Sequence, residues 1–138
     1  MNANETWWFA NRADQARRNY GYNKAQNDYE RGLARTQAGW DRADLVRQFS
    51  RQRQALPANY NRRGVMNSGI WNKALADWTT DKTRALTRQT AAADMKQQGY
   101  DLADYQLADI KRKALDDLAA QRTAYEQTIA SILRTNYG

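Results

Sequence analysis

Residues 56–69 read Leu56-Pro57-Ala58-Asn59-Tyr60-Asn61-Arg62-Arg63-Gly64-Val65-Met66-Asn67-Ser68-Gly69, and this stretch decides the fold. It holds the single proline of the chain, which disfavours helix at the preceding residue, followed by several turn-forming residues. We expect Pro57, Gly64 and Gly69 to shape the turn. Asn67 or Ser68 is expected to cap the following helix by accepting a hydrogen bond from a free first-turn amide. The sequence therefore predicts a loop over residues 56–69.

On both sides of this loop the chain is rich in helix-forming residues, chiefly Ala, Arg, Gln, Leu and Lys. Its apolar residues recur mostly in steps of 3, 4 or 7, which is the spacing of a helical stripe and not of a strand. Tyr22 and Leu33, like Tyr29 and Trp40, are 11 residues apart, and this period is typical of helices that supercoil little. We predict one elongated domain, 1–138, with helices over about 6–55 and about 69–135.

If the chain folds back at about residue 63, opposing residues have numbers that add up to about 126. Phe49 then lies near Trp78, and Trp8 near Leu118, so that aromatic side chains meet aromatic or aliphatic ones. A single rod kinked at Pro57 is the alternative arrangement. The predicted fold class is all-α: a long antiparallel helical hairpin with coiled-coil-like packing.

The composition indicates that the hairpin needs partners. Leu, Ile, Val and Phe make up only 18 of 138 residues, below the share of about 20% expected of a chain that folds alone, yet the chain holds 5 Trp and 8 Tyr. Narrow apolar stripes of this kind are usually buried between chains, so we expect a homo-oligomer, with a trimer favoured. The seam between copies is expected to contain Tyr22, Tyr29, Leu33, Trp40, Phe49, Trp71, Trp78, Tyr100, Leu107, Ile110, Leu118 and Ile129.

Four glycines, at positions 21, 32, 39 and 99, fall inside the predicted helices. Each is expected to cost about 1 kcal/mol relative to alanine. Close approach of a neighbouring helix would explain them, and locally broken helices are the alternative.

The residues that the chain lacks exclude several classes of site. It has no His and no Cys, which excludes zinc sites built on these ligands, Ser-His-Asp and Cys-His nucleophiles, and disulfides. Paired carboxylates such as Asp101 and Asp104 are expected to form salt bridges on a helix face. No apolar run reaches 18 residues, so no membrane span is expected, and the first residues lack the features of a signal peptide. We predict no catalytic residue, no metal, no cofactor and no small-molecule substrate.

The net charge is +7, and the basic residues are densest between Arg42 and Arg63. Arginine recognises the carboxylates of acidic protein surfaces and also phosphates. Trp7 and Trp8 form an apolar cluster near the start of the chain, suited either to a partner's groove or to the end of its own bundle. The residues expected to contact a partner protein are Trp7, Trp8, Arg47, Arg51, Arg62 and Arg63.

One segment resembles a known group of proteins. The stretch Arg63-Gly64-Val65-Met66-Asn67-Ser68-Gly69-Ile70-Trp71-Asn72-Lys73-Ala74-Leu75-Ala76-Asp77-Trp78 resembles the Arg-Gly-Leu-x-x-Ser-Gly-Ile-x-x-x-Ala-Leu segment of small helical proteins encoded among the virion structural genes of tailed bacteriophages. Residues 28–33 and 100–105 are similar to the Tyr/Trp-Asp-x-x-Leu-x-x-Leu units from which the two long helices of the same proteins are built. Val65 stands where the pattern has Leu, and the detailed match covers about 16 residues.

This resemblance implies a non-enzymatic component of a phage particle. The expected function is that of a minor tail or tail-tip protein, assembled in the host cytoplasm as a multi-copy helical bundle against larger virion proteins. Only a turn-and-cap role carries over to the residues of the matched segment. The alternative is a scaffolding or head-packaged protein that contacts nucleic acid through the basic stretch Arg42–Arg63. A further alternative is a small helical chaperone that is stable only with its client.

Overall fold

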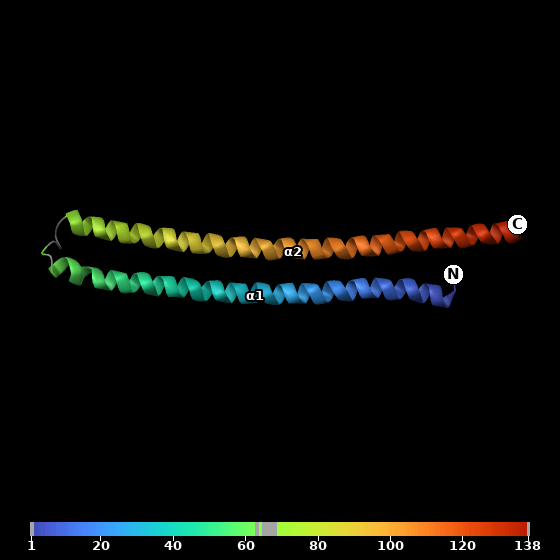
Figure 1. Cartoon of the computed structure of the whole chain (residues 1–138), viewed down its shortest axis with the longest axis horizontal. Helices are drawn as coiled ribbons and strands as arrows, with labels where there is room; N and C mark the ends of the chain where they lie inside the picture. The colour runs from blue at the N-terminus through green and yellow to red at the C-terminus, as the bar shows by residue number, and fades with distance from the viewer. Residues whose placement is uncertain (1, 63, 65–68, 138) are drawn as a thin grey trace. The chain divides into compact units, whose positions relative to one another are not determined.

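The computed structural model describes residues 2–62, 64 and 69–137. Within these residues it contains two helices and no strand: α1, Ala3–Arg62, and α2, Gly69–Tyr137 (Figure 1). The two helices pack against each other in antiparallel directions, which confirms the predicted all-α helical hairpin. A rod kinked at Pro57 is therefore wrong.

The first helix is longer at both ends than predicted. It begins at Ala3, where Asn2 and Glu5 form a reciprocal cap: the Glu5 amide donates to Asn2 Oδ1 (3.0 Å), and the Asn2 amide donates to Glu5 Oε2 (2.7 Å). It continues through Pro57 to Arg62, so the prediction that it ends near residue 55 is wrong. Tyr60, one turn after Pro57, packs edge-on against Trp71 with ring centroids 5.6 Å apart. This contact favours helix beyond the proline.

Gly64 ends the helix as predicted for a turn residue. Its φ of 71° lies in the left-handed region, where a side chain would be strained, and its amide donates to the carbonyl of Asn61 at 3.0 Å. α2 begins at Gly69, at the predicted position. The predicted capping residues Asn67 and Ser68 lie outside the described residues, as does Arg63.

The position of Pro57 inside α1 leads to a testable prediction. A proline inside a helix removes one backbone hydrogen bond and costs about 3 kcal/mol, part of which is offset because proline also restricts the unfolded chain. We expect Pro57→Ala to raise the free energy of unfolding by about 2 kcal/mol, measured by urea denaturation followed by circular dichroism. Ala58→Ser, an exposed neighbouring change, serves as the control. A lower stability for Pro57→Ala would show that the proline is needed for the turn.

Contacts between the helices divide the chain into two units. Unit 1 comprises Met1–Tyr29 and Tyr100–Gly138, and unit 2 comprises Glu30–Gly99. In each unit one half of α1 packs on one half of α2. Phe9, in unit 1, is the buried apolar residue of the described chain, with 9% of its surface exposed. Neither unit therefore encloses a broad hydrophobic core.

The packing of α1 on α2 follows an 11-residue period. In unit 2, Trp78 Nε1 donates to the Phe49 carbonyl (2.9 Å) and Gln89 Nε2 donates to the Ala38 carbonyl (2.9 Å). In unit 1, Asn27 Nδ2 donates to the carbonyl of Tyr100 (3.0 Å). Successive donor–acceptor pairs are thus 11 residues apart on both helices. Eleven residues make close to three helical turns, which keeps the same face of each helix toward the other with little supercoiling.

Candidate functional site

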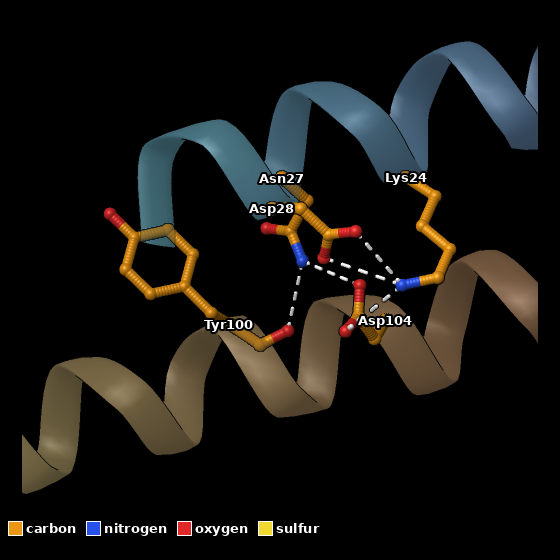
Figure 2. Close-up of polar contacts among 5 residues, drawn as sticks. All are labelled: Lys24, Asn27, Asp28, Tyr100 and Asp104. Atoms are coloured by element: carbon orange, nitrogen blue, oxygen red, sulfur yellow. Dashed lines mark hydrogen bonds and ion pairs between the residues drawn. The ribbon is translucent and has the colours of Figure 1, made fainter. Parts of the chain in front are cut away.

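A cluster of polar side chains joins the helices in unit 1 (Figure 2). Asn27 Nδ2 donates to Asp104 Oδ1 (2.8 Å) as well as to the Tyr100 carbonyl (3.0 Å). Lys24 Nζ lies 3.1 Å from Asp28 Oδ2 and 3.8 Å from Asp104 Oδ2, and its pKa is raised, mainly by the hydrogen bond to Asp28. Through these contacts, polar groups of α1 and α2 serve as each other's hydrogen-bond and ion-pair partners. Such a cluster favours one register of the helices over others.

The twelve residues of the predicted seam divide into a half-buried group and an exposed group. Seven of them are half-buried: Phe49, Trp71, Trp78, Tyr100, Leu107, Leu118 and Ile129. The other five are largely exposed: Tyr22 (72%), Tyr29 (68%), Leu33 (53%), Trp40 (63%) and Ile110 (64%). As predicted, Phe49 contacts Trp78, with ring centroids 6.5 Å apart. The sequence does not distinguish the face used inside the chain from the face left exposed.

Four of the five exposed residues lie on α1, on the side turned away from α2. Tyr29 follows Asn27, an interface residue, by two positions, which places it about 200° around the helix. Tyr22 and Tyr29 belong to unit 1, and Leu33 and Trp40 to unit 2. Trp7, 65% exposed, precedes Tyr29 by twice 11 residues and so lies on the same side. We call this set, Trp7, Tyr22, Tyr29, Leu33 and Trp40, the outward face of α1.

The glycines inside α1 lie beside these large side chains. Gly21 precedes Tyr22, Gly32 precedes Leu33 and Gly39 precedes Trp40. A Cβ built on any of the three would have no neighbouring atom within 4 Å. Packing within the described chain therefore does not require glycine at these positions, although each costs about 1 kcal/mol in helix stability. The helix is nevertheless continuous through all three, so the alternative of locally broken helices is wrong.

Two ion pairs flank the outward face of α1. Arg18 pairs with Asp14 in unit 1, and Arg47 Nη2 lies 2.9 Å from Asp44 Oδ1 in unit 2. All four side chains are at least half exposed. Each exposed pair of this kind stabilises its helix by only a few tenths of a kcal/mol. The charged groups are therefore accessible to the charges of another molecule.

The residues of the Trp7-Trp8-Phe9 cluster have different environments. Phe9 packs edge-on against Trp8 (ring centroids 4.8 Å apart) and lies 6.2 Å from the Tyr125 ring, while Trp7 stays exposed. A shallow cavity of about 360 Å³ lies here, lined by Glu5, Trp8, Phe9, Gln121 and Tyr125. Phe9 therefore closes the end of unit 1, and Trp7 points away from it.

The hydroxyl of Tyr125 donates a hydrogen bond to Glu5 at this end. This bond lowers the pKa of Glu5, with a further contribution from the Asn2 amide, and raises the pKa of Tyr125. Because the Glu5 pKa is lowered on folding, its contribution to stability is complete above the usual carboxyl pKa and is lost as the pH falls through the lowered value. Because the Tyr125 pKa is raised, its contribution is complete below the usual tyrosine pKa and is lost at higher pH.

We therefore expect unit 1 to lose stability in acid below about pH 4 and in base above about pH 10. The measurement is the midpoint of urea unfolding as a function of pH, for the wild-type chain and for Glu5→Gln. The variant is expected to show a smaller loss in acid than wild type. Glu30→Gln, which removes an exposed carboxylate elsewhere on α1, is the control for net charge. Equal acid sensitivity of wild type and Glu5→Gln would contradict the assignment.

The arginines from Arg42 to Arg62 do not form one surface. Arg42 Nη1 donates to Thr90 Oγ1 at 3.0 Å, and the Arg53 guanidinium lies 5.6 Å from the centre of the Trp71 ring. Both are used in the contact with α2. Arg51 and Arg62, 11 residues apart, are exposed and follow Trp40 at the same spacing on α1. The predicted partner contacts at Arg47, Arg51 and Arg62 are thus accessible.

Comparison of the chain with protein-family models, with curated proteins and with solved structures gave no match in any of the three. Across residues 2–62, 64 and 69–137, His, Cys, Asp and Glu residues do not gather in a group of three that would hold a metal ion. Neither helix, over its described length, has a segment long and apolar enough to cross a membrane. The outward face of α1 is the candidate site because it exposes the large apolar side chains of Trp7, Tyr22, Tyr29, Leu33 and Trp40.

Sequence reasoning missed the polar part of the helix–helix contact. Asn27 and Gln89 have polar side chains, and Ala38 takes part through its backbone carbonyl, so a search for hydrophobic stripes does not detect these contacts. A signal was nonetheless present, because Asn27, Ala38, Phe49 and Tyr60 are spaced by 11 residues. The same spacing relates Trp78, Gln89 and Tyr100 on α2.

Proposed function

We propose that this protein is a non-enzymatic structural and interaction protein that assembles in several copies into a helical bundle. The observation that carries the proposal is the outward face of α1, where five large apolar side chains are exposed while the chain's own interface lies elsewhere. Exposed apolar surfaces of this extent mark sites of association. Three glycines beside them have room for a closely packed helix.

The proposed setting is a bacteriophage particle, in which the bundle is a minor tail or tail-tip component packed against larger virion proteins. The support for this setting is the resemblance of residues 63–75 to the phage proteins described above. Arg51 and Arg62, both exposed, are the proposed contacts with the larger partner. Antibody against the chain is expected to label the tails of purified particles, and labelling of neither tail nor head would contradict this setting.

The proposal of a multi-copy bundle is tested by light scattering coupled to size exclusion on the purified chain, together with far-ultraviolet circular dichroism. We expect a strongly helical species whose mass is a multiple of 16.0 kDa and unchanged between about 50 mM and about 500 mM salt, because apolar contacts are not screened. A helical monomer at all concentrations would overturn it.

Contact with nucleic acid is the second candidate function, and the exposure of Arg51 and Arg62 on one side of α1 favours it. It predicts that random duplex DNA is retarded in a gel and released steeply as salt is added. Arg51→Gln with Arg62→Gln is expected to abolish this shift if the two arginines contact phosphates. Absence of any shift at low salt would exclude this function.

A further inference from the structure

Within residues 21–40, the outward face of α1 repeats with the same 11-residue period as the interface between α1 and α2. Tyr22 is followed after 11 residues by Leu33, Tyr29 by Trp40, and Gly21 by Gly32. A helix stays in contact along such a face only if its own side chains repeat with the same period. Copies of this chain supply helices with that period, so the outward face is matched to the chain's own helices.

Of the two helices, α1 supplies the better match. The exposed apolar residues in the middle of α2 are Met95, Leu102, Tyr105 and Ile110. Eleven residues after them stand Gln106, Lys113, Asp116 and Gln121, so these four residues include no pair at the 11-residue spacing that relates Tyr22 to Leu33 and Tyr29 to Trp40 on α1. The outward face of a second α1 is therefore the complement of the first.

The exposed surface of the chain is large enough for a second copy to bind. The chain exposes 10442 Å², whereas a compact monomer of 16.0 kDa exposes about 7,400 Å². A standard stable interface removes about 800 Å² from each partner. The surplus of about 3,000 Å² is several times larger than this, and Phe9 is the buried apolar residue of the described chain.

The charges that flank the outward face select the direction of the second copy. Along α1 the order is Asp14, Arg18, then Asp44 and Arg47. If a second α1 runs antiparallel, with opposing residue numbers that add to about 62, Arg18 faces Asp44 of the second copy and Asp14 faces its Arg47. Both pairs are opposite in charge, and all four side chains are at least half exposed.

The same register brings the apolar residues together. Tyr22 faces Trp40 of the second copy and Tyr29 faces its Leu33, so four of the five large side chains meet another, while Trp7 faces Ala55. A shift by one repeat of 11 residues in one direction would place Tyr29 opposite Asp44. In the other direction it would place Trp40 opposite Asn11. One register thus satisfies both the apolar and the charged residues.

We propose that a second copy of this chain docks antiparallel on the outward face of α1, centred near residue 31, with unit 1 of each copy against unit 2 of the other. This inference rests on the proposed function and specifies its contact. The contact is two-fold symmetric, so it closes with two copies, in place of the trimer expected from composition. A parallel arrangement would instead place Arg18 opposite Arg18 and Asp44 opposite Asp44, where like charges repel.

Cysteine pairing tests the direction, because the natural chain has no cysteine. Ala25 and Thr36 lie on one flank of the outward face, 11 residues apart, and face each other in the antiparallel register. We expect Ala25→Cys and Thr36→Cys chains to form a disulfide with each other when mixed, unfolded and refolded together. Neither is expected to form one alone, because like positions are then about 16 Å apart, beyond disulfide reach. Disulfides formed within each single variant, with none favoured between the two, would overturn the proposal in favour of a parallel contact.

A charged residue on the face tests its location. Trp40→Glu is expected to reduce the mass measured by light scattering from two chains to one, while α2 contacts inside the chain are retained. Tyr105→Glu, which changes an exposed ring on α2, is the matched control and is expected to leave two chains. An oligomer that persists in Trp40→Glu and dissociates in Tyr105→Glu would overturn the proposed face and leave self-association intact. A wild-type chain that is monomeric throughout would overturn self-association itself.

Discussion

Replacing Trp78 with alanine is expected to lower the free energy of unfolding by about 3 kcal/mol. The Trp78 ring packs edge-on against Phe49 at 6.5 Å, and its indole N–H donates to the Phe49 carbonyl at 2.9 Å. Lys82 Nζ lies 5.1 Å from the centre of the same ring. Alanine removes all three interactions at once. Urea denaturation followed by circular dichroism measures the change, at one protein concentration because association adds to apparent stability.

Trp78→Phe separates the ring from its hydrogen bond. Phenylalanine keeps an aromatic face against Phe49 but has no N–H to donate, so we expect a loss of about 1 kcal/mol. The two variants leave the outward face of α1 unchanged, and both are expected to retain the oligomeric state of the wild type. A loss for Trp78→Ala no larger than that for Trp78→Phe would contradict a packing role for the ring.

The hairpin itself was predictable because its signals are local. Helix-forming residues fill both halves of the chain, and Pro57, Gly64 and Gly69 interrupt them near the middle. The end of α1 was missed for a physical reason: the local preference of Pro57 is opposed by the packing of Tyr60 on Trp71, a contact between residues that local rules do not pair. Tertiary packing overrides a local preference at that boundary.

The candidate site was predicted in its residues but not in its arrangement. Tyr29 and Trp40 have the same spacing as Ala38 and Phe49, and both sets lie on α1. Periodicity alone identifies residues that share a face, yet it does not say which face meets α2. That choice depends on Asn27 and Gln89, whose hydrogen bonds to opposing carbonyls require a partner helix at a fixed register. The face of α1 that meets α2 was thus visible only once both helices were placed, although their antiparallel direction was predictable.

Phe9→Ala is expected to have an effect of similar size, about 3 kcal/mol, but confined to unit 1. Phe9 is 9% exposed and contacts the rings of Trp8 and Tyr125, so truncation leaves a gap that few neighbours can fill. In a pair of helices each segment contacts only the segment beside it, and stability is therefore distributed locally along the pair. Loss of the Phe9 contacts is expected to loosen residues 3–20 and 115–130 first.

Amide hydrogen exchange measures this localisation directly. In Phe9→Ala we expect faster exchange in the unit 1 segments and unchanged exchange at 35–55 and 75–95 of unit 2. Phe9→Leu keeps an apolar side chain of similar size and is expected to cost less than about 1.5 kcal/mol. Trp7→Ala, which removes the exposed neighbour, is expected to leave the exchange of residues 115–130 unchanged. Faster exchange throughout both units in Phe9→Ala would show instead that the hairpin unfolds as one cooperative body, in which the buried ring supports residues far beyond its contacts.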